Sequence, residues 1–121
     1  AAVNQLYCSR WGHLFLPCVL TRRDMERICD GRHFAWAKIA LFMWLLTPER
    51  LPEAARHVFE SWLGESRRQE LVSAHEYLVW IDGDALVLDH SVLLRRFVSD
   101  AEARSKALVV AEDMSWSDWV N

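Results

Sequence analysis

The sequence predicts an α/β fold in which a mostly parallel sheet is flanked by helices. An apolar run over Tyr77–Ile81 has the composition of a strand that is covered on both faces. Helical patterns separate this run from other short apolar runs, and alternating strands and helices are typical of a layered α/β fold. Two carboxylates, Asp82 and Asp84, follow the run directly. Ligands bind beyond the carboxyl ends of strands in such sheets, so we expect a site there.

Length and composition predict one domain over residues 1–121. The chain has 121 residues, 52% of them hydrophobic, which suits one compact core and is too short for two ordinary domains. The net charge is -3, with 14 basic residues dispersed among 17 acidic ones. We therefore expect no nucleic-acid partner and no membrane contact from this segment. The longest apolar run, Phe34–Leu46, is interrupted by Lys38 and is shorter than the roughly 20 residues of a membrane span.

The cysteines and histidines show no metal-binding pattern. Cys8, Cys18 and Cys29 form no Cys-x-x-Cys pair, so a structural zinc site lacks its spacing and its partner ligands. Buried thiols are expected, with one disulfide plus a free thiol as the alternative. The histidines are scattered singly, which favours surface or hydrogen-bonded side chains over metal ligands.

The amino-terminal third predicts a helix followed by a strand. Ala1–Trp11 has apolar residues at helical spacing, and Gly12 is typical of a helix end. His13–Leu20 is apolar enough for a strand, although Pro17 restricts it to an edge, an end or a bulge. Residues 21–32 are charged, and we expect irregular structure there.

Two helices are predicted next. His33–Thr47 contains no glycine or proline, is closed by Pro48, and is apolar around nearly its whole circumference, which indicates a mostly buried helix. Thr47–Leu63 begins with proline and acidic residues, which suit a helix start. Residues 65–74 are expected to form a polar connector that is helical in one interpretation.

The carboxyl-terminal third predicts short elements. Ala85–Leu88 is expected to be extended, and Asp89 or Ser91 is expected to cap a helix over Val92–Val98. Lys106–Ala111 is a further short apolar strand in this interpretation.

The Asp82-x-Asp84 pair predicts a metal site. Two carboxylates this close repel each other unless a positive charge lies between them, and oxygen-only ligands suit a hard cation such as Mg²⁺ or Mn²⁺. The alternative is an ordinary acidic turn, because Asp-Gly is common turn chemistry.

Three segments together resemble one enzyme family. They are Trp36-Ala37-Lys38, then Trp80-Ile81-Asp82-Gly83-Asp84-Ala85, and the amino-terminal Asn4-x-x-Tyr7-Cys8-x-x-Trp11-Gly12-His13. The combination resembles the galactosyl-, xylosyl- and mannosyltransferase family that includes galactomannan galactosyltransferase and xyloglucan xylosyltransferases. The resemblance covers nearly the whole chain, and its specific part is the Asp-x-Asp pair with the Trp36/Lys38 helix.

The resemblance implies a partial GT-A (Rossmann-like) nucleotide-diphospho-sugar transferase fold and a retaining transfer of a hexose or pentose. The implied partners are a nucleotide-sugar donor and a glycan acceptor, and the implied cofactor is Mn²⁺ (or Mg²⁺). Asp82 and Asp84 would hold the metal, Asp82 and Lys38 would also bind the donor nucleotide or diphosphate, and Asn121 would contact acceptor or donor sugar. Family members work in the Golgi lumen as membrane-anchored proteins, so the same location is implied for the parent protein.

The chain also departs from the family pattern. Residues 48–75 form a longer insert than is usual. Asn121 matches the first residue of an Asn-x-Gly-x-Phe motif whose continuation is not in the sequence. The resemblance therefore implies a partial domain, without its first strand and its carboxyl-terminal half, and we expect the isolated chain not to turn over substrate.

Other interpretations remain beside this one. An Asp-x-Asp phosphatase-like hydrolase would use the first carboxylate as a nucleophile and the second as an acid/base, but that class usually opens with its acidic strand. A non-catalytic α/β binding fragment would keep the fold without activity. In the plainest interpretation, Lys38 is a surface lysine whose stem lies along the helix, and Trp36 and Trp80 are core side chains.

Overall fold

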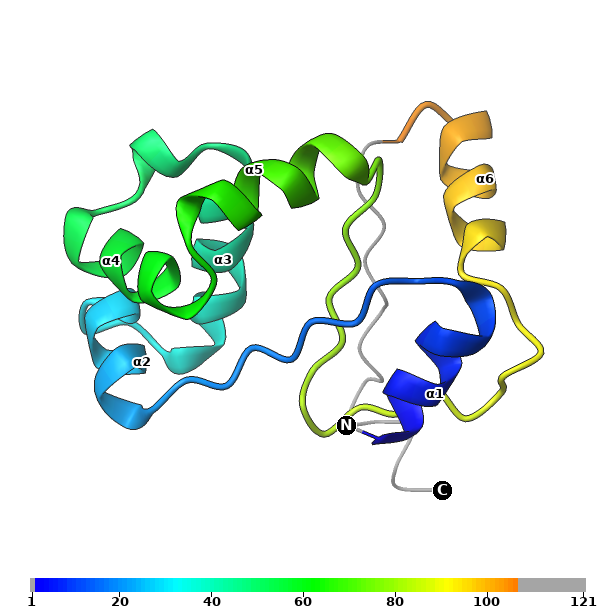
Figure 1. Cartoon of the computed structure of the whole chain (residues 1–121), viewed down its shortest axis with the longest axis horizontal. Helices are drawn as coiled ribbons and strands as arrows, with labels where there is room; N and C mark the ends of the chain where they lie inside the picture. The colour runs from blue at the N-terminus through cyan, green and yellow to red at the C-terminus, as the bar shows by residue number, and fades with distance from the viewer. Residues whose placement is uncertain (1, 107–121) are drawn as a thin grey trace, which may run out of the picture. The chain divides into compact units, whose positions relative to one another are not determined.

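The computed structural model describes residues 2–106, and the regular structure of this part is helical (Figure 1). The predicted α/β fold with a mostly parallel sheet, and with it the GT-A arrangement, is therefore wrong, because residues 2–106 contain no strand and no sheet. The elements are α1 (Ala2–Trp11), α2 (Arg22–Cys29), the 3₁₀ helix η1 (Phe34–Trp36), α3 (Ala37–Leu46), the 3₁₀ helix η2 (Pro48–Arg50), α4 (Glu53–Trp62), α5 (Glu65–Ala74) and α6 (Arg95–Ala103).

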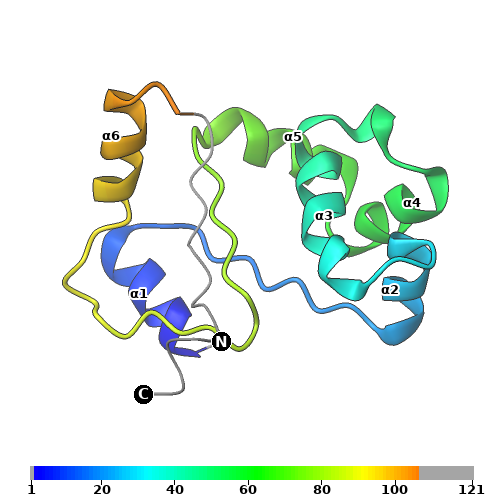
Figure 2. The same cartoon turned by 180° about the vertical axis from the view of Figure 1, so that it is seen from behind.

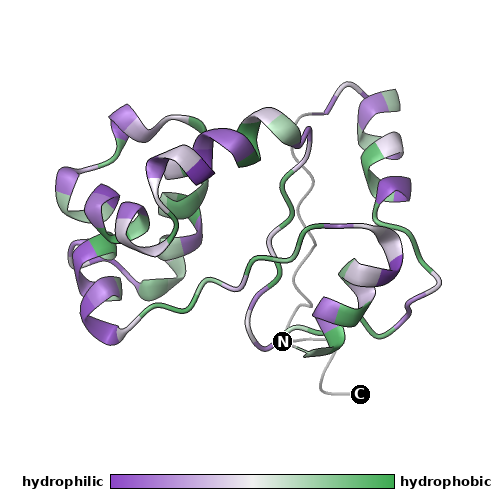
Figure 3. Ribbon diagram, viewed as in Figure 1, coloured by the Kyte–Doolittle hydropathy of each residue, from purple (hydrophilic) through white to green (hydrophobic). Residues whose placement is uncertain are grey.

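The run Tyr77–Ile81 has the composition of a strand but makes no sheet with the described residues. Val79 and Trp80 are exposed, and only Leu78 packs against a hydrophobic core. The colouring in Figure 3 shows that hydrophobic residues occur along this segment, although residues 2–106 supply no sheet to cover it. An apolar run indicates burial in a sheet only when neighbouring strands supply the backbone partners.

The other predicted strands are also absent from residues 2–106. His13–Leu20 contains no strand, in keeping with Pro17, which has no backbone N–H to donate to a ladder. Ala85–Leu88 has no regular structure, and no strand partner for it lies in the described part. The predicted strand Lys106–Ala111 lies outside the described residues apart from Lys106 itself.

The chain divides into two compact units. The smaller consists of residues 1–15 and 86–121, of which 2–15 and 86–106 are described, and the larger consists of residues 16–85. The Asp82-x-Asp84 pair and Lys38 all belong to the larger unit.

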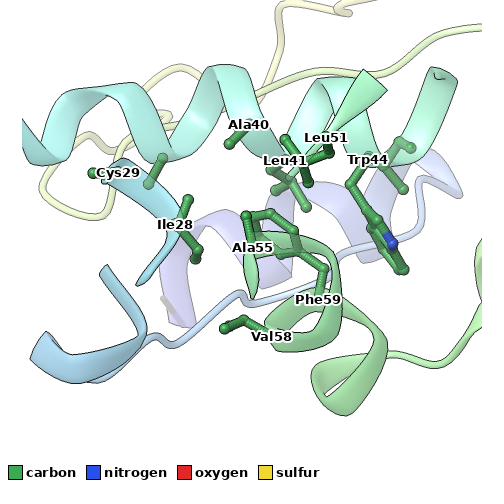
Figure 4. Close-up of a cluster of buried hydrophobic side chains, with 11 residues drawn as sticks. Ile28, Cys29, Ala40, Leu41, Trp44, Leu51, Ala55, Val58 and Phe59 are labelled. Atoms are coloured by element: carbon green, nitrogen blue, oxygen red, sulfur yellow. The ribbon is translucent and has the colours of Figure 1, made fainter. Parts of the chain in front are cut away.

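The larger unit is built around α2, α3 and α4, which lie together in both views (Figure 2). At its centre the rings of Trp44 and Phe59 stack with their centroids 5.6 Å apart, and both side chains are fully buried (Figure 4). Such aromatic burial is a large hydrophobic contribution to folding. The remaining buried members of this core are Ile28, Cys29, Ala37, Ala40, Leu41, Leu45, Leu51, Ala55 and Val58.

The two helices predicted within this unit are confirmed with small changes. The predicted His33–Thr47 helix begins with the 3₁₀ turn η1 and continues as α3, which ends before Pro48. The predicted Thr47–Leu63 helix is likewise divided into η2 and α4.

Two further helices replace expected connecting segments. α2 occupies the stretch expected to be irregular, and Thr21 caps it: the Thr21 hydroxyl accepts a hydrogen bond from the Asp24 backbone N–H, and the Asp24 carboxylate accepts one from the Thr21 backbone N–H. α5 occupies the polar connector 65–74, in agreement with the helical interpretation of it.

The smaller unit confirms the first predicted helix as α1. Its buried face holds the loop that follows Leu86: Asn4 Oδ1 accepts from the Val87 N–H, and Trp11 Nε1 donates to the His90 carbonyl. α6 begins three residues later than predicted. Asp89 does not cap it, because its carboxylate accepts hydrogen bonds from the backbone N–H and hydroxyl of Ser91.

The three cysteines are free thiols, and the prediction of buried thiols is confirmed for Cys8 and Cys29, whereas Cys18 is half-buried. Burial raises the pKa of the Cys8 and Cys18 thiols, which keeps them protonated and unreactive at neutral pH. No helix within residues 2–106 has the length and apolar character needed to cross a bilayer.

Candidate functional site at the Asp-x-Asp turn

The pair Asp82 and Asp84 lies on an exposed turn. The Ala85 N–H donates to the Asp82 carbonyl over 3.0 Å and closes the turn. Gly83 between them has no positive φ, and a Cβ added there would meet no atom within 4 Å. The turn therefore does not depend on glycine, and Asp82 and Asp84 are both exposed residues.

The Asp82 carboxylate contacts two side chains through different oxygens. Trp80 Nε1 donates to Oδ1 over 2.6 Å, and Lys38 Nζ lies 3.5 Å from Oδ2. The hydrogen bond from Trp80 is the main cause that holds the pKa of Asp82 below its usual value; desolvation opposes it, and the charge and hydrogen bond of Lys38 lower the pKa by a smaller amount. Asp82 is therefore an anion at neutral pH.

The Lys38–Asp82 ion pair is exposed enough to be exchanged. The Lys38 side chain is 38% exposed and that of Asp82 is 54% exposed. Pairs of this exposure contribute only about 0.2–1 kcal/mol, since water screens the two charges. A ligand with stronger charges can therefore separate Lys38 from Asp82 at little cost.

Asp84 differs from Asp82 in its surroundings. Within the described part of the chain, the Asp84 carboxylate makes no hydrogen bond and no ion pair, and the residue is exposed. Its oxygens are available to a ligand without prior loss of a protein contact.

The structure brings together some of the predicted site residues. Lys38, on the first turn of α3, meets Asp82 although the two are distant in the sequence. Asn121 lies outside the described residues. Trp36 does not join the site: half of it is exposed, and the Arg32 guanidinium lies 5.9 Å from its ring centroid. The prediction that Trp36 and Trp80 are core side chains is wrong for both.

Trp80 is the functional candidate that the sequence interpretation missed. It is 37% exposed and supplies the shortest hydrogen bond to Asp82. A signal was present, because residues i and i+2 of an extended segment project to the same side. Trp80 and Asp82 have this spacing.

The donor set fits one class of metal site. Across residues 2–106, no group of three or more His, Cys, Asp or Glu side chains is arranged to hold a metal ion, so the protein alone does not build a closed cage. Mg²⁺-type ions are commonly held by one or two carboxylates together with substrate phosphates. Asp82 and Asp84 fit that arrangement, with Lys38 near enough to face a phosphate.

A hollow lies elsewhere in the larger unit. It has a volume of about 280 Å³, and it is lined by Pro48, Glu49, Arg56, His57, Glu60 and Glu65. None of the residues at the Asp-x-Asp turn lines it, so it is not an extension of the candidate site.

The local geometry of Lys38, Trp80, Asp82 and Asp84 thus carries the functional argument. Comparisons of the chain with protein-family models, with curated proteins and with solved structures give no match.

Proposed function

We propose that the chain carries the metal- and diphosphate-binding end of a retaining glycosyltransferase that moves a hexose or pentose from a nucleotide-sugar donor to a glycan. The observation that supports it most is the 3.5 Å approach of Lys38 to Asp82. The sequence resemblance assigns Lys38 and Asp82, which belong to two separate motifs, to binding of the donor nucleotide or diphosphate. The proposal requires this local arrangement and does not require a parallel sheet.

The residues at the turn match the chemistry of the leaving group. Asp82 and Asp84 offer anionic oxygens to a divalent cation, Mn²⁺ or Mg²⁺. When bound, such a cation acts as a Lewis acid and offsets the charge that grows on the departing nucleoside diphosphate. Lys38 presents an ammonium group to phosphate oxygens at the same place, and Trp80 fixes the orientation of the Asp82 carboxylate through its indole N–H.

The remaining parts of the proposal follow the resemblance alone. Asn121, outside the described residues, is proposed to contact the acceptor or the donor sugar. The proposed location is the Golgi lumen, as part of a membrane-anchored parent protein.

Metal-dependent nucleotide binding tests the proposal. In calorimetric titrations with UDP and with GDP, we expect the chain to bind one of them in the presence of Mn²⁺ and not in the presence of EDTA. Asp84→Ala should weaken this binding roughly tenfold or more, because losing a charge-assisted contact costs about 1.5–3 kcal/mol.

Asp100→Ala is the matched control, since it removes an exposed carboxylate from α6 rather than from the turn. It should bind as the wild type does. Absence of Mn²⁺-dependent binding for either nucleotide would overturn the proposal. Hydrolysis of a phosphate ester that is lost in Asp82→Ala would favour the phosphatase-like alternative instead.

A further inference from the structure

We propose that Lys38 and Trp80 form a latch on Asp82 that makes a divalent cation and a diphosphate bind together rather than separately. Here the latch means the ion pair from Lys38 and the hydrogen bond from Trp80, taken together. The inference rests on the proposed function and adds a coupling between the two ligands of that site.

Both oxygens of Asp82 are engaged by the latch. The indole N–H of Trp80 occupies Oδ1 and the ammonium group of Lys38 faces Oδ2. Asp84, which makes no hydrogen bond or ion pair in the described part of the chain, is the carboxylate open to a cation. A cation that arrives alone therefore gains one free carboxylate and must compete for the other.

The ammonium group of Lys38 is carried by α3, a helix whose neighbouring residues are buried in the core. Lys38 follows Ala37 and precedes Ala40 and Leu41 on α3, and all three neighbours are buried in the core of the larger unit. Figure 4 shows Ala40 and Leu41 among the residues of that core. Because α3 is held by its buried face, only the flexible stem of Lys38 can move the charge away from Asp82.

A diphosphate changes the competition. A cation at Oδ2 and the Lys38 ammonium group repel each other at contact distance, so the cation alone must drive the lysine into water. A diphosphate offers the displaced ammonium group new anionic partners and offers the cation further oxygens. Each ligand therefore raises the affinity for the other by the same factor, as linkage requires.

The test compares Lys38→Met with Lys106→Met. Both substitutions remove one lysine charge. Lys106, the other lysine of the sequence, belongs to the smaller unit, whereas the turn belongs to the larger one. Free Mn²⁺ is measured by electron paramagnetic resonance during titration of each protein, first with Mn²⁺ alone and then with UDP or GDP present.

We expect Lys38→Met to bind Mn²⁺ alone up to about fivefold more tightly than the wild type, because the competing ion pair is gone. In the same variant the factor by which the nucleotide tightens Mn²⁺ binding should fall. Lys106→Met should match the wild type in both measurements. Circular dichroism establishes that each variant keeps its helices.

Trp80→Phe tests the other half of the latch. It removes the indole N–H and keeps an aromatic ring, so its missing signal identifies the Trp80 indole resonance in the wild-type NMR spectrum. We expect that resonance to shift when Mg²⁺ and the nucleotide are added together, and to shift less with Mg²⁺ alone. An unchanged resonance in the presence of both would remove Trp80 from the latch.

The outcomes separate this inference from the proposed function. If the wild type shows Asp84-dependent binding of Mn²⁺ with nucleotide, but Lys38→Met has the wild-type affinity for Mn²⁺ alone and the same coupling, the latch is overturned and the function stands. If the wild type shows no nucleotide-dependent Mn²⁺ binding, the proposed function and the latch both fail.

Discussion

The hydroxyl of Tyr7 connects α1 by hydrogen bonds to the segment that follows the Asp-x-Asp turn. Tyr7 is completely buried, donates to the Val92 carbonyl over 2.8 Å and accepts from the Leu94 N–H over 3.0 Å. The ring centroids of His13 and His90 lie 6.0 Å and 5.7 Å from the ring centroid of Tyr7. One side chain thus satisfies two backbone groups in a segment without regular structure, as buried polar groups require.

Tyr7→Phe should destabilise the smaller unit by about 1–2 kcal/mol, because the Val92 carbonyl and the Leu94 N–H lose their partner without a replacement. Urea unfolding measures the loss, and hydrogen exchange at the Leu94 amide should accelerate. Leu6→Ala on the same helix is the control, since Leu6 is 65% exposed and should cost less than about 0.5 kcal/mol. A Leu94 amide protected as in the wild type would contradict the role given to Tyr7.

Some residues of the candidate site were predictable from the sequence and others were not. Asp82 and Asp84 were found from their spacing after an apolar run, and the turn between them is confirmed. Lys38 entered only through the family resemblance, because no periodicity relates residues so distant in sequence. Trp80 was assigned to the core, since a tryptophan in an apolar run is usually buried. Because the described residues form no sheet, Trp80 is exposed beside Asp82.

At the scale of elements, α5 is joined to α3 by Arg68. Its guanidinium donates to the Leu45 carbonyl over 2.7 Å, in the last turn of α3, where helix carbonyls lack partners within the helix. Glu65 holds the same guanidinium through two hydrogen bonds. The hydrogen bonds from Arg68 and then from Gln69 lower the pKa of Glu65 from 4.5 to about 2.

This contact makes part of the stability depend on pH. Because the folded pKa of Glu65 is lower than the unfolded value, its contribution is complete above about pH 4.5 and is lost as the pH falls toward 2. Glu65→Gln should therefore lower the melting temperature at pH 7, and its difference from the wild type should shrink between pH 4.5 and 2.

Glu70→Gln, on the same helix, provides the comparison for Glu65→Gln. Its partner Arg67 lies on α5 as well and holds no second element, so we expect a smaller change in melting temperature at pH 7. A difference between Glu65→Gln and the wild type that stays constant down to pH 2 would contradict the ion-pair account.

The elements that the sequence predicted well are those with strong local signals. α1, α3 and α4 follow apolar spacing bounded by glycine or proline. α2 was missed although Thr21 and Asp24 have the spacing of a capping box, because the stretch is mostly charged. Its buried face is short, with Ile28 and Cys29 at its end, so periodicity gave a weak indication.

At the scale of the whole molecule, the fold class was wrong because strands were inferred from composition. Tyr77–Ile81 and His13–Leu20 are both apolar and without regular structure, and neither pairs in a sheet with the described residues. Helix signals are local and can be read from neighbouring residues, whereas strand pairing depends on distant segments. The helices were therefore predictable from the sequence, and the absence of a sheet across residues 2–106 was not.

At the level of the molecule, the two units are stabilised by different residues. The core around Trp44 and Phe59 lies wholly within the larger unit, while Tyr7 and Asn4 hold the smaller one. Phe59→Ala should cost about 3–5 kcal/mol, since the residue is fully buried and stacked on Trp44. The loss should appear first as faster hydrogen exchange in α3 and α4.

The same variant shows how the candidate site depends on its scaffold. Because α3 carries Lys38, loosening its core should weaken the hold of Lys38 on Asp82, while the amides of α1 keep their protection. Val19→Ala is the matched control, because Val19 is 84% exposed in the same unit and its substitution should leave exchange unchanged. Equal loss of protection in α1 and α3 would mean that the two units unfold together. In that case, the stability of the Asp-x-Asp turn would depend on Tyr7 as much as on Phe59.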